Sequence, residues 1–266
     1  MVGYSELIDR KKVCLDHTIS DIALDWITGD IHIFENENDE IKVVQITDTK
    51  FPEHKLFHHT VKNGKLSITD GRKKKIQIGF NLHKTNLEIY LPKKQFDSIS
   101  IDCTGVNLFV DHLDTIKCKC HLTSGTTKLS GKMEEFTFHA IGSNVEGDFL
   151  EIQKLHLQTT ATKIDFSGKF SDLNVNATGR TITVSSSTML QKIKSISTGA
   201  NLKVEIPEND GFSCHLKKLS GNFKSDFSLM HSGDSYIYKN GKNIFSAEIR
   251  GGSFSISKIL NTTSDN

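Results

Sequence analysis

The sequence is poor in proline, in net charge and in long apolar runs, and each shortage excludes a class of protein. Three prolines stand against nineteen glycines in 266 residues. Few prolines with many β-branched residues and regular glycines favour a strand-rich fold. The 33 basic and 32 acidic residues balance, so nothing in the overall charge favours nucleic acid as a partner. No apolar run approaches the roughly 18 residues that span a bilayer, so we expect no transmembrane segment.

The first residues carry no export signal. Residues 1–12 are polar and charged, whereas a secretory signal peptide needs an apolar stretch of about 7–15 residues. This absence predicts a cytoplasmic protein, with association with the cell envelope left open. The one local basic run, Arg72–Lys75, could be a phosphate or lipid patch, but a solvated turn is the ordinary interpretation of such a run.

The most informative feature is a short repeat. Each unit reads apolar-x-apolar-x-small, then a corner, then apolar-x-apolar. The units begin at Ile99, Ile116, Phe136, Leu155, Leu173 and Ile193, and their corner residues are Gly105, Gly125, Gly142, Ala161, Gly179 and Gly199, which lie 17–20 residues apart. So short a unit cannot bury its apolar face alone, but stacked units can. The repeat predicts an all-β fold, a parallel β-helix or β-solenoid with about 17–20 residues per coil.

Two other repeat-rich folds fit the pattern less well. Leucine-rich repeats have a constant leucine frame and a helical half in each unit, and both are missing. A β-sandwich shows turns every 8–12 residues and does not explain corner residues at equivalent positions in successive units.

The flanking sequence predicts three regions. Residues 1–95 hold short strand patterns that we interpret as antiparallel hairpins, a cap that protects the first coil from edge-to-edge pairing. Residues 96–258 form the solenoid, which starts near Ile99 and is interrupted after Pro207. Residues 259–266 are polar and are expected to be a disordered tail. The expected cap strands are Leu24–Ile33, Ile41–Ile46, Gly64–Ile68, Lys75–Ile78 and Asn86–Leu91.

Cysteine chemistry is not expected. Five cysteines at irregular spacing (Cys14, Cys103, Cys118, Cys120 and Cys214) predict reduced thiols rather than a disulfide framework. Cys118, Cys120 and His121 lie together, but structural zinc sites use wider cysteine spacing and a second ligand pair. Side chains alternate between the two faces of a strand, so Cys118 and Cys120 lie on the same inward face as Ile116. We therefore interpret them as core residues.

The histidines and carboxylates give no site either. His139 and His156 have outward parity in neighbouring coils, and Asp102 is equivalent to His139. Gln158 and Asn176 continue this column, as expected of an ordinary exposed polar ladder.

A glycosidase needs two carboxylates within roughly 5–10 Å, and we expect no two adjacent coils to place carboxylates at one strand position. No catalytic, cofactor-binding or metal-ligating residue is predicted, and no cofactor is expected.

Three segments resemble the bacterial putative-adhesin family of β-strand-repeat proteins. They are Trp26–Ile33, Leu87–Gly105 and Ile249–Ile256, and the resemblance covers roughly residues 18–258. It implies a right-handed parallel β-helix without established catalytic residues. Some relatives belong to cell-envelope stress systems, and others carry export signals or membrane anchors.

The sequence favours a non-enzymatic bacterial scaffold, an adhesin or envelope-associated binding protein, because long solenoid faces suit extended partners. The partner would be a protein, a glycan or another envelope component. A carbohydrate-active β-helix enzyme and a self-assembling structural protein stay open as alternatives.

Overall fold

The computed structural model describes residues 7–16, 18–74 and 85–259. It divides into two compact units, Met1–Met133 and Glu134–Asn266, and each is described by itself. The first unit contains two short 3₁₀ turns, Glu53–Lys55 and Gly71–Lys74, and the strands β1 (Leu7–Leu15), β2 (Asp21–Asn36), β3 (Ile41–Asp48), β4 (His58–Lys62), β5 (Lys65–Thr69), β6 (Thr85–Pro92) and β7 (Phe96–Thr160) as far as residue 133. The predicted strand Lys75–Ile78 and the tail from Leu260 lie outside the described residues.

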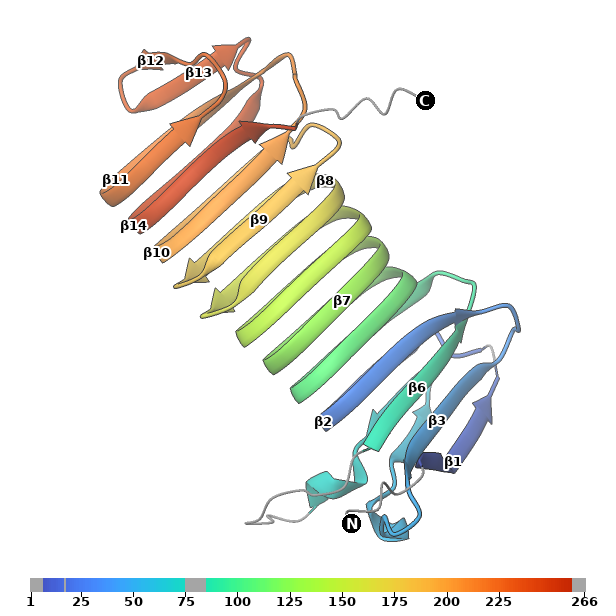
Figure 1. Cartoon of the computed structure of the whole chain (residues 1–266). Coiled ribbons are helices and arrows are strands. Elements are labelled where there is room, and N and C mark those ends of the chain that lie inside the picture. The colour runs from blue at the N-terminus through green and yellow to red at the C-terminus, as the bar shows by residue number, and fades with distance from the viewer. Residues whose placement is uncertain (1–6, 17, 75–84, 260–266) are drawn as a thin grey trace, which may run out of the picture. The chain divides into compact units, whose positions relative to one another are not determined.

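The second unit holds the rest of β7 and seven further strands. These are β8 (Lys163–Thr178), β9 (Thr181–Ser186), β10 (Lys192–Ile206), β11 (Gly211–Ser225), β12 (Met230–Ser232), β13 (Ser235–Lys239) and β14 (Asn243–Lys258). The strands β8, β9, β10, β14 and β11 pair with one another in parallel (Figure 1), and β13 is antiparallel to β11. The parallel β-solenoid expected from the repeat is confirmed.

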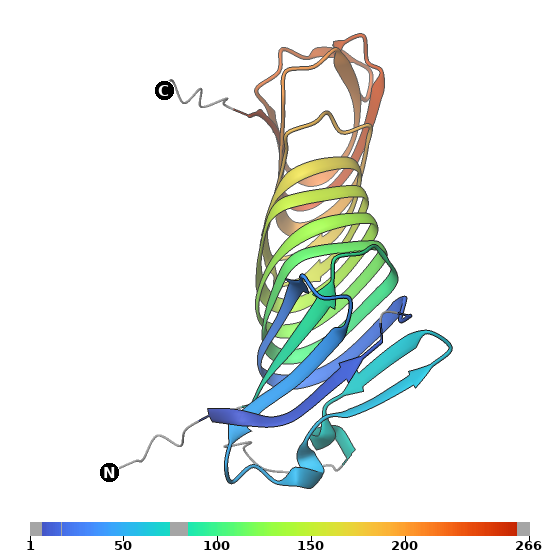
Figure 2. The same cartoon turned by 90° about the vertical axis from the view of Figure 1, so that its right-hand side faces the viewer.

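Parallel pairing also extends into the first unit, further than the sequence predicts. Antiparallel pairs occur as expected between β1 and β3 and between β3 and β6. The β4–β5 hairpin (light blue in Figure 2) is antiparallel too. However, β2 is parallel to β7 on one edge and to β5 and β6 on the other. The predicted start of the solenoid near Ile99 is therefore one strand layer too late, whereas the domain limits at residues 95 and 258 stay predictions.

The inward apolar residues of the stacked units form two internal ladders in the second unit. Leu155 pairs with Leu173, Leu173 with Ile193, and Ile193 with Phe245. All four side chains are at most 1% exposed. The second ladder contains Val145, Ile164, Ile182, Leu202 and Phe254. Burying each such side chain contributes about 1.5–3 kcal/mol, so these columns are the main source of stability in the unit.

The corner residues need a left-handed backbone, and glycine occupies only some of these positions. In the first unit Gly105 (φ 66°) has register equivalents in Thr28 (φ 49°) and Ser124 (φ 62°). The expected corner residue Gly125 follows Ser124 and serves a different purpose. A Cβ at Gly125 would lie 2.0 Å from the carbonyl oxygen of Val106, so glycine is required there because two coils approach closely.

Part of the basic run is buried, which corrects the prediction of a solvated turn. Arg72 is 7% exposed and lies beside the fully buried Asp70, with 2.6 Å between nitrogen and carboxylate oxygen. Its guanidinium donates to the carbonyl oxygen of Ile27 and, at 3.0 Å each, to the carbonyl and hydroxyl oxygens of Thr28. Arg72 therefore holds the strained Thr28 corner, while Lys73 pairs with Asp25.

Candidate functional site

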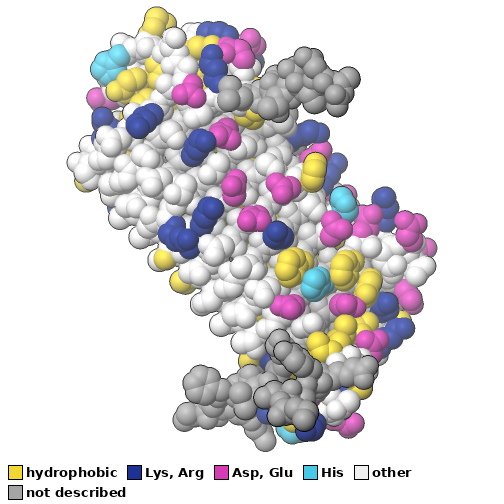
Figure 3. Space-filling model, viewed as in Figure 1, with side chains coloured by type: hydrophobic (Ala, Val, Ile, Leu, Met, Phe, Trp, Pro, Cys, Tyr) yellow, Lys and Arg dark blue, Asp and Glu magenta, His cyan; other side chains and the backbone are white. Residues whose placement is uncertain are grey.

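Four half-buried rings stand in a row on the outer face of the first unit. His32 and Phe34 project from β2, Phe109 from β7 and Tyr90 from β6. The His32 and Phe109 rings stack with centroids 4.6 Å apart, and the Phe34 and Tyr90 rings with centroids 5.2 Å apart. His32 and Phe34 are 5.6 Å apart, which completes the row. We call these four residues the aromatic ladder; Figure 3 shows hydrophobic and histidine side chains gathered over β2 and β6.

Strand register produces the ladder. His32 is paired with Phe109, and Phe34 with Tyr90, across parallel strands. Cross-strand aromatic pairs of this kind stabilise a sheet by about 0.2–1 kcal/mol each. The planes of stacked neighbours differ by only 19–28°, so the rings cover one another's faces and turn their edges to solvent. Ring edges carry partial positive charge and favour hydrogen-bond acceptors.

Polar groups close the β6 end of the ladder. The Lys42 ammonium lies 3.9 Å from the centroid of the Tyr90 ring. The Tyr90 hydroxyl donates to the Glu88 carboxylate at 2.7 Å. Burial, followed by this hydrogen bond, raises the pKa of Tyr90 to about 12. The phenol therefore remains a proton donor at neutral pH and cannot act there as a base.

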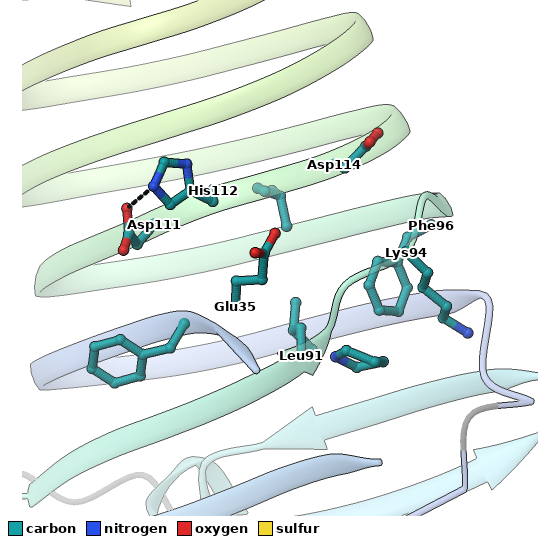
Figure 4. A pocket seen from close by; sticks show the side chains of 10 residues that line it. Glu35, Leu91, Lys94, Phe96, Asp111, His112 and Asp114 are labelled. Carbon is teal, nitrogen blue, oxygen red and sulfur yellow. Dashed lines mark ion pairs between the residues drawn. The ribbon is translucent and has the colours of Figure 1, made fainter. Parts of the chain in front are cut away.

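A small cleft borders the ladder at Phe34. Phe34 lines it together with Glu35, Leu91, Pro92, Lys94, Phe96 and residues 111–114 (Figure 4). Its volume is about 10 Å³, which holds no more than one water molecule. We call it the corner cleft. It is too small for an organic substrate, but it extends the amphipathic surface of the ladder with carboxylates.

The charged groups of the corner cleft all have partners. Asp111 contacts His112 at 3.5 Å and accepts a hydrogen bond from Ser130. Asp114 accepts from Gln95 at 3.1 Å. The remaining carboxylate, that of Glu35, lies 3.5 Å from the Lys93 ammonium. The cleft thus offers hydrogen-bond acceptors at a rim, with no nucleophile activated by a neighbouring base.

A strand irregularity positions His112. Asp111, His112 and Leu113 lie opposite only Ser130 and Gly131, and the amide of His112 donates to the Ser130 hydroxyl at 3.0 Å. His112 takes a left-handed backbone (φ 52°) and points outward, with 65% of its side chain exposed. Such β-bulges redirect one side chain out of the pleat.

The second unit repeats this bulge. Phe149 (φ 55°) lies between Asp148 and Leu150, opposite Ser167 and Gly168. The Ser167 hydroxyl donates to Asp148 at 2.7 Å. Phe149 is 84% exposed. The equivalent residues of the two bulges lie 37 residues apart in the sequence, a two-coil period that would have revealed both positions.

The cysteines of the repeat are core residues, as predicted, whereas Cys14 in β1 is exposed. Cys103, Cys118 and Cys120 are at most 5% exposed. Burial raises the pKa of Cys103 and Cys118 to about 12, and it also raises the pKa of Cys120 well above the usual value of a thiol. All five cysteines are free thiols. Within the described ranges, no group of three histidine, cysteine or acidic residues is placed to hold a metal ion.

The histidine column differs in detail from the prediction. His156 is paired with Asn174, and Gln158 with Asn176, so His156 is not in the same column as Gln158. In the first unit, the ring of His121 lies 3.6 Å from Asp102. Both side chains are about half exposed, so the pair is an ordinary surface contact.

One prediction about carboxylates is wrong. Glu146 in β7 is paired directly with Asp165 in β8, so two adjacent coils do place carboxylates at one strand position. Both acids are exposed.

The aromatic ladder was not predicted either. Its only signal in the sequence is alternation: His32 and Phe34 flank the buried Ile33 and therefore point to the opposite, outer face of the strand. Tyr90 and Phe109 could be added only once the strand register was known.

Comparisons with known proteins agree with the fold. A putative lipid binding protein from Parabacteroides distasonis has a solved structure that is 12% identical, with a TM-score of 0.53; the match covers 97% of this chain and 98% of that one. A putative cell adhesion protein from Clostridium sporogenes (15% identity, TM-score 0.34, 94% and 99% covered) and a putative adhesin from Bacteroides fragilis (15%, 0.37, 94% and 98%) are also similar. Among curated proteins, none matches the chain.

The described residues contain no helix that is long and apolar enough to cross a membrane.

A family model matches most of the chain. The expected kinship with adhesin-like β-strand-repeat proteins is confirmed, because the model of one such family matches residues 19–250. The chain belongs to the Toastrack DUF4097 family.

Proposed function

We propose that this chain is a non-enzymatic binding scaffold of the bacterial cell envelope, and that the aromatic ladder with its corner cleft binds an extended envelope component. The carrying observation is the ladder itself. Four rings, of which His32 and Tyr90 carry polar groups, face outward and cross three neighbouring strands in one line. Aromatic residues of this kind are enriched in binding surfaces because they combine large apolar area with a polar group.

The rest of the surface supports binding rather than turnover. Carboxylates at the corner cleft and the hydroxyl of Tyr90 supply hydrogen bonds at fixed positions. The cleft is too small to enclose a substrate. A partner would therefore lie along the outside of the sheet, across the strands.

The test is co-sedimentation of the purified chain with isolated cell-wall sacculi and with envelope fragments. Phe109→Thr and Tyr90→Thr remove two rings while keeping strand propensity. We expect the double variant to lose at least about tenfold in apparent affinity, which corresponds to roughly 1.4 kcal/mol.

The matched control is Lys192→Thr with Lys194→Thr on β10, two exposed residues of the second unit. It should sediment like the unchanged chain. Circular dichroism confirms that each variant is folded. Equal sedimentation of the ladder variant and the control, or no sedimentation of the unchanged chain, would contradict the proposal.

A further inference from the structure

The last parallel strand of the second unit has an open edge. On one side β11 pairs with β14 from Phe212 to Ser225 (Figure 1). On the other side β13 pairs with β11 only from Gly211 to His215. No strand among the described residues pairs with this side between Lys217 and Ser225. We call residues 217–225 the open edge.

An unpaired edge is a template for another strand. Its free N–H and C=O groups bind an added strand through main-chain hydrogen bonds, while alternate side chains decide which strand is accepted. The open edge is longer than an average strand of about 5–6 residues. Residues 217–222 are all exposed, so a partner strand has access to it.

Two apolar side chains mark the open edge. Leu219 is 65% exposed. Phe223 is half-buried, with its ring centroid 5.2 Å from that of Tyr236 and 5.8 Å from that of Phe254. The pair offers an apolar contact to side chains of an added strand, and its support by two further rings fixes the position of Phe223.

The charge of the open edge is of one sign. Between residues 211 and 225 there is no acidic residue, whereas Lys217, Lys218 and Lys224 are present. Lys217 lies 3.5 Å from Glu248 of β14. Lys218 and Lys224 have no ion pair with an acid within the described part of the chain, so their charges are available to a partner.

The same charges disfavour a second copy of the chain. A second copy would bring Lys217, Lys218 and Lys224 of one open edge against the same three lysines of the other, with no acidic residue on either edge. Like charges close together across a strand pair are destabilising.

We infer that the open edge of β11 binds an extended acidic peptide segment of another protein, which adds to the sheet as a strand. Its acidic side chains would meet Lys218 and Lys224, and its apolar side chains would meet Leu219 and Phe223. This interaction surface lies in the second unit and does not depend on the aromatic ladder.

The test is a selection from a random library of displayed peptides about 12 residues long on the purified full chain. We expect enriched peptides to combine acidic residues with apolar residues. Hydrogen exchange with a selected peptide bound should slow at the amides of residues 217–225, because an added strand protects them. Lys218→Glu with Lys224→Glu should weaken binding at least about tenfold.

The matched control carries the same charge change on a strand with both edges paired. Lys192→Glu with Lys194→Glu alters β10, which pairs with β8 and β14, and should leave affinity within about twofold. Peptides without acidic residues, equal loss in both variants, or protection away from the open edge would overturn the inference. Sedimentation showing a dimer that the Lys218 and Lys224 variant breaks would also overturn it, because a second copy would then occupy the edge.

Discussion

A corner of the first unit and two corners of the second reach the same left-handed backbone by different means. In the second unit, Gly142 and Gly199 supply φ values of 64° and 59° through the residue type alone. In the first unit, Thr28 takes φ 49° while the buried Arg72 binds its carbonyl and hydroxyl oxygens. A strained backbone can thus be supplied by a permissive residue or held by tertiary hydrogen bonds. Gly142 and Gly199 use the first solution, and the β2 layer uses the second at Thr28.

The largest expected effect on stability comes from removing Arg72, whose hydrogen bonds hold the Thr28 corner. Arg72→Met leaves the fully buried Asp70 without its cation, so we expect the free energy of unfolding to fall by about 3–5 kcal/mol. Trp26 is the only tryptophan and lies under Arg72, with 5.9 Å between the guanidinium carbon and the ring centroid. Its fluorescence during urea unfolding therefore reports on the first unit.

A second variant separates the charge from the fold. Arg72→Met combined with Asp70→Leu removes both members of the ion pair, and it should recover part of the lost stability because no buried charge stays unpaired. If the single variant loses less than about 1 kcal/mol, Arg72 does not hold the corner.

The second unit should respond to small changes at glycines that lie against another coil. A Cβ at Gly168 would lie 2.0 Å from the carbonyl oxygen of Leu150, whereas at Gly142 nothing lies within 4 Å. We expect Gly168→Ala to cost about 2–3 kcal/mol because the backbone must move. Gly142→Ala should cost about 1 kcal/mol, from the left-handed backbone alone. Chemical unfolding followed by circular dichroism measures both, and equal costs would contradict the distinction.

Sequence parity was enough to predict the ladder of Leu155, Leu173 and Ile193, because alternation and spacing identify inward positions without any knowledge of neighbours. Parity could not show that β2 is parallel, since Ile31 and Ile33 have the same inward pattern in either direction. Composition could not separate Arg72 from the exposed Lys73. Its burial depends on Asp70 and on the corner at Thr28, which only the tertiary structure brings together.

The same limit applies to the candidate surface. The ring of His32 becomes part of a ladder only through the register that places Phe109 beside it. The open edge could not be predicted, because it depends on where β13 stops pairing with β11. Sequence patterns report which face of a strand is buried, and they do not report which of its edges is covered.

The exposed ion pairs of Glu208 in the second unit contrast with the buried Asp70–Arg72 pair of the first, and their contribution to stability should depend on pH. Glu208 binds Lys239 and Lys258 at 2.7 and 2.8 Å and accepts a hydrogen bond from Tyr238. The hydrogen bonds from Lys239, Lys258 and Tyr238 lower its pKa from 4.5 to about 2. The folded state therefore gains stability from this carboxylate above pH 4.5, and loses that gain as the pH falls toward 2.

Thermal unfolding at a series of pH values tests this contact. Glu208→Gln should lower the melting temperature slightly at neutral pH, and the difference from the unchanged chain should vanish near pH 2. A difference in melting temperature that is constant over the whole pH range would show that the charge of Glu208 does not stabilise this part of the second unit. The effect should be small, because water screens the attraction between exposed charges.

The smallest expected effect distinguishes the two bulges. Phe149 takes φ 55° with 84% of its surface exposed, so its ring offsets little of the strain of a left-handed backbone. Asparagine adopts this conformation more readily. Phe149→Asn should therefore stabilise the second unit by up to about 1 kcal/mol, as measured by chemical unfolding. His112→Asn should gain less, because the His112 ring contacts Asp111. Destabilisation by Phe149→Asn would mean that the ring is packed against the fold, and the bulge would then be a structural support rather than a means of exposing one aromatic side chain.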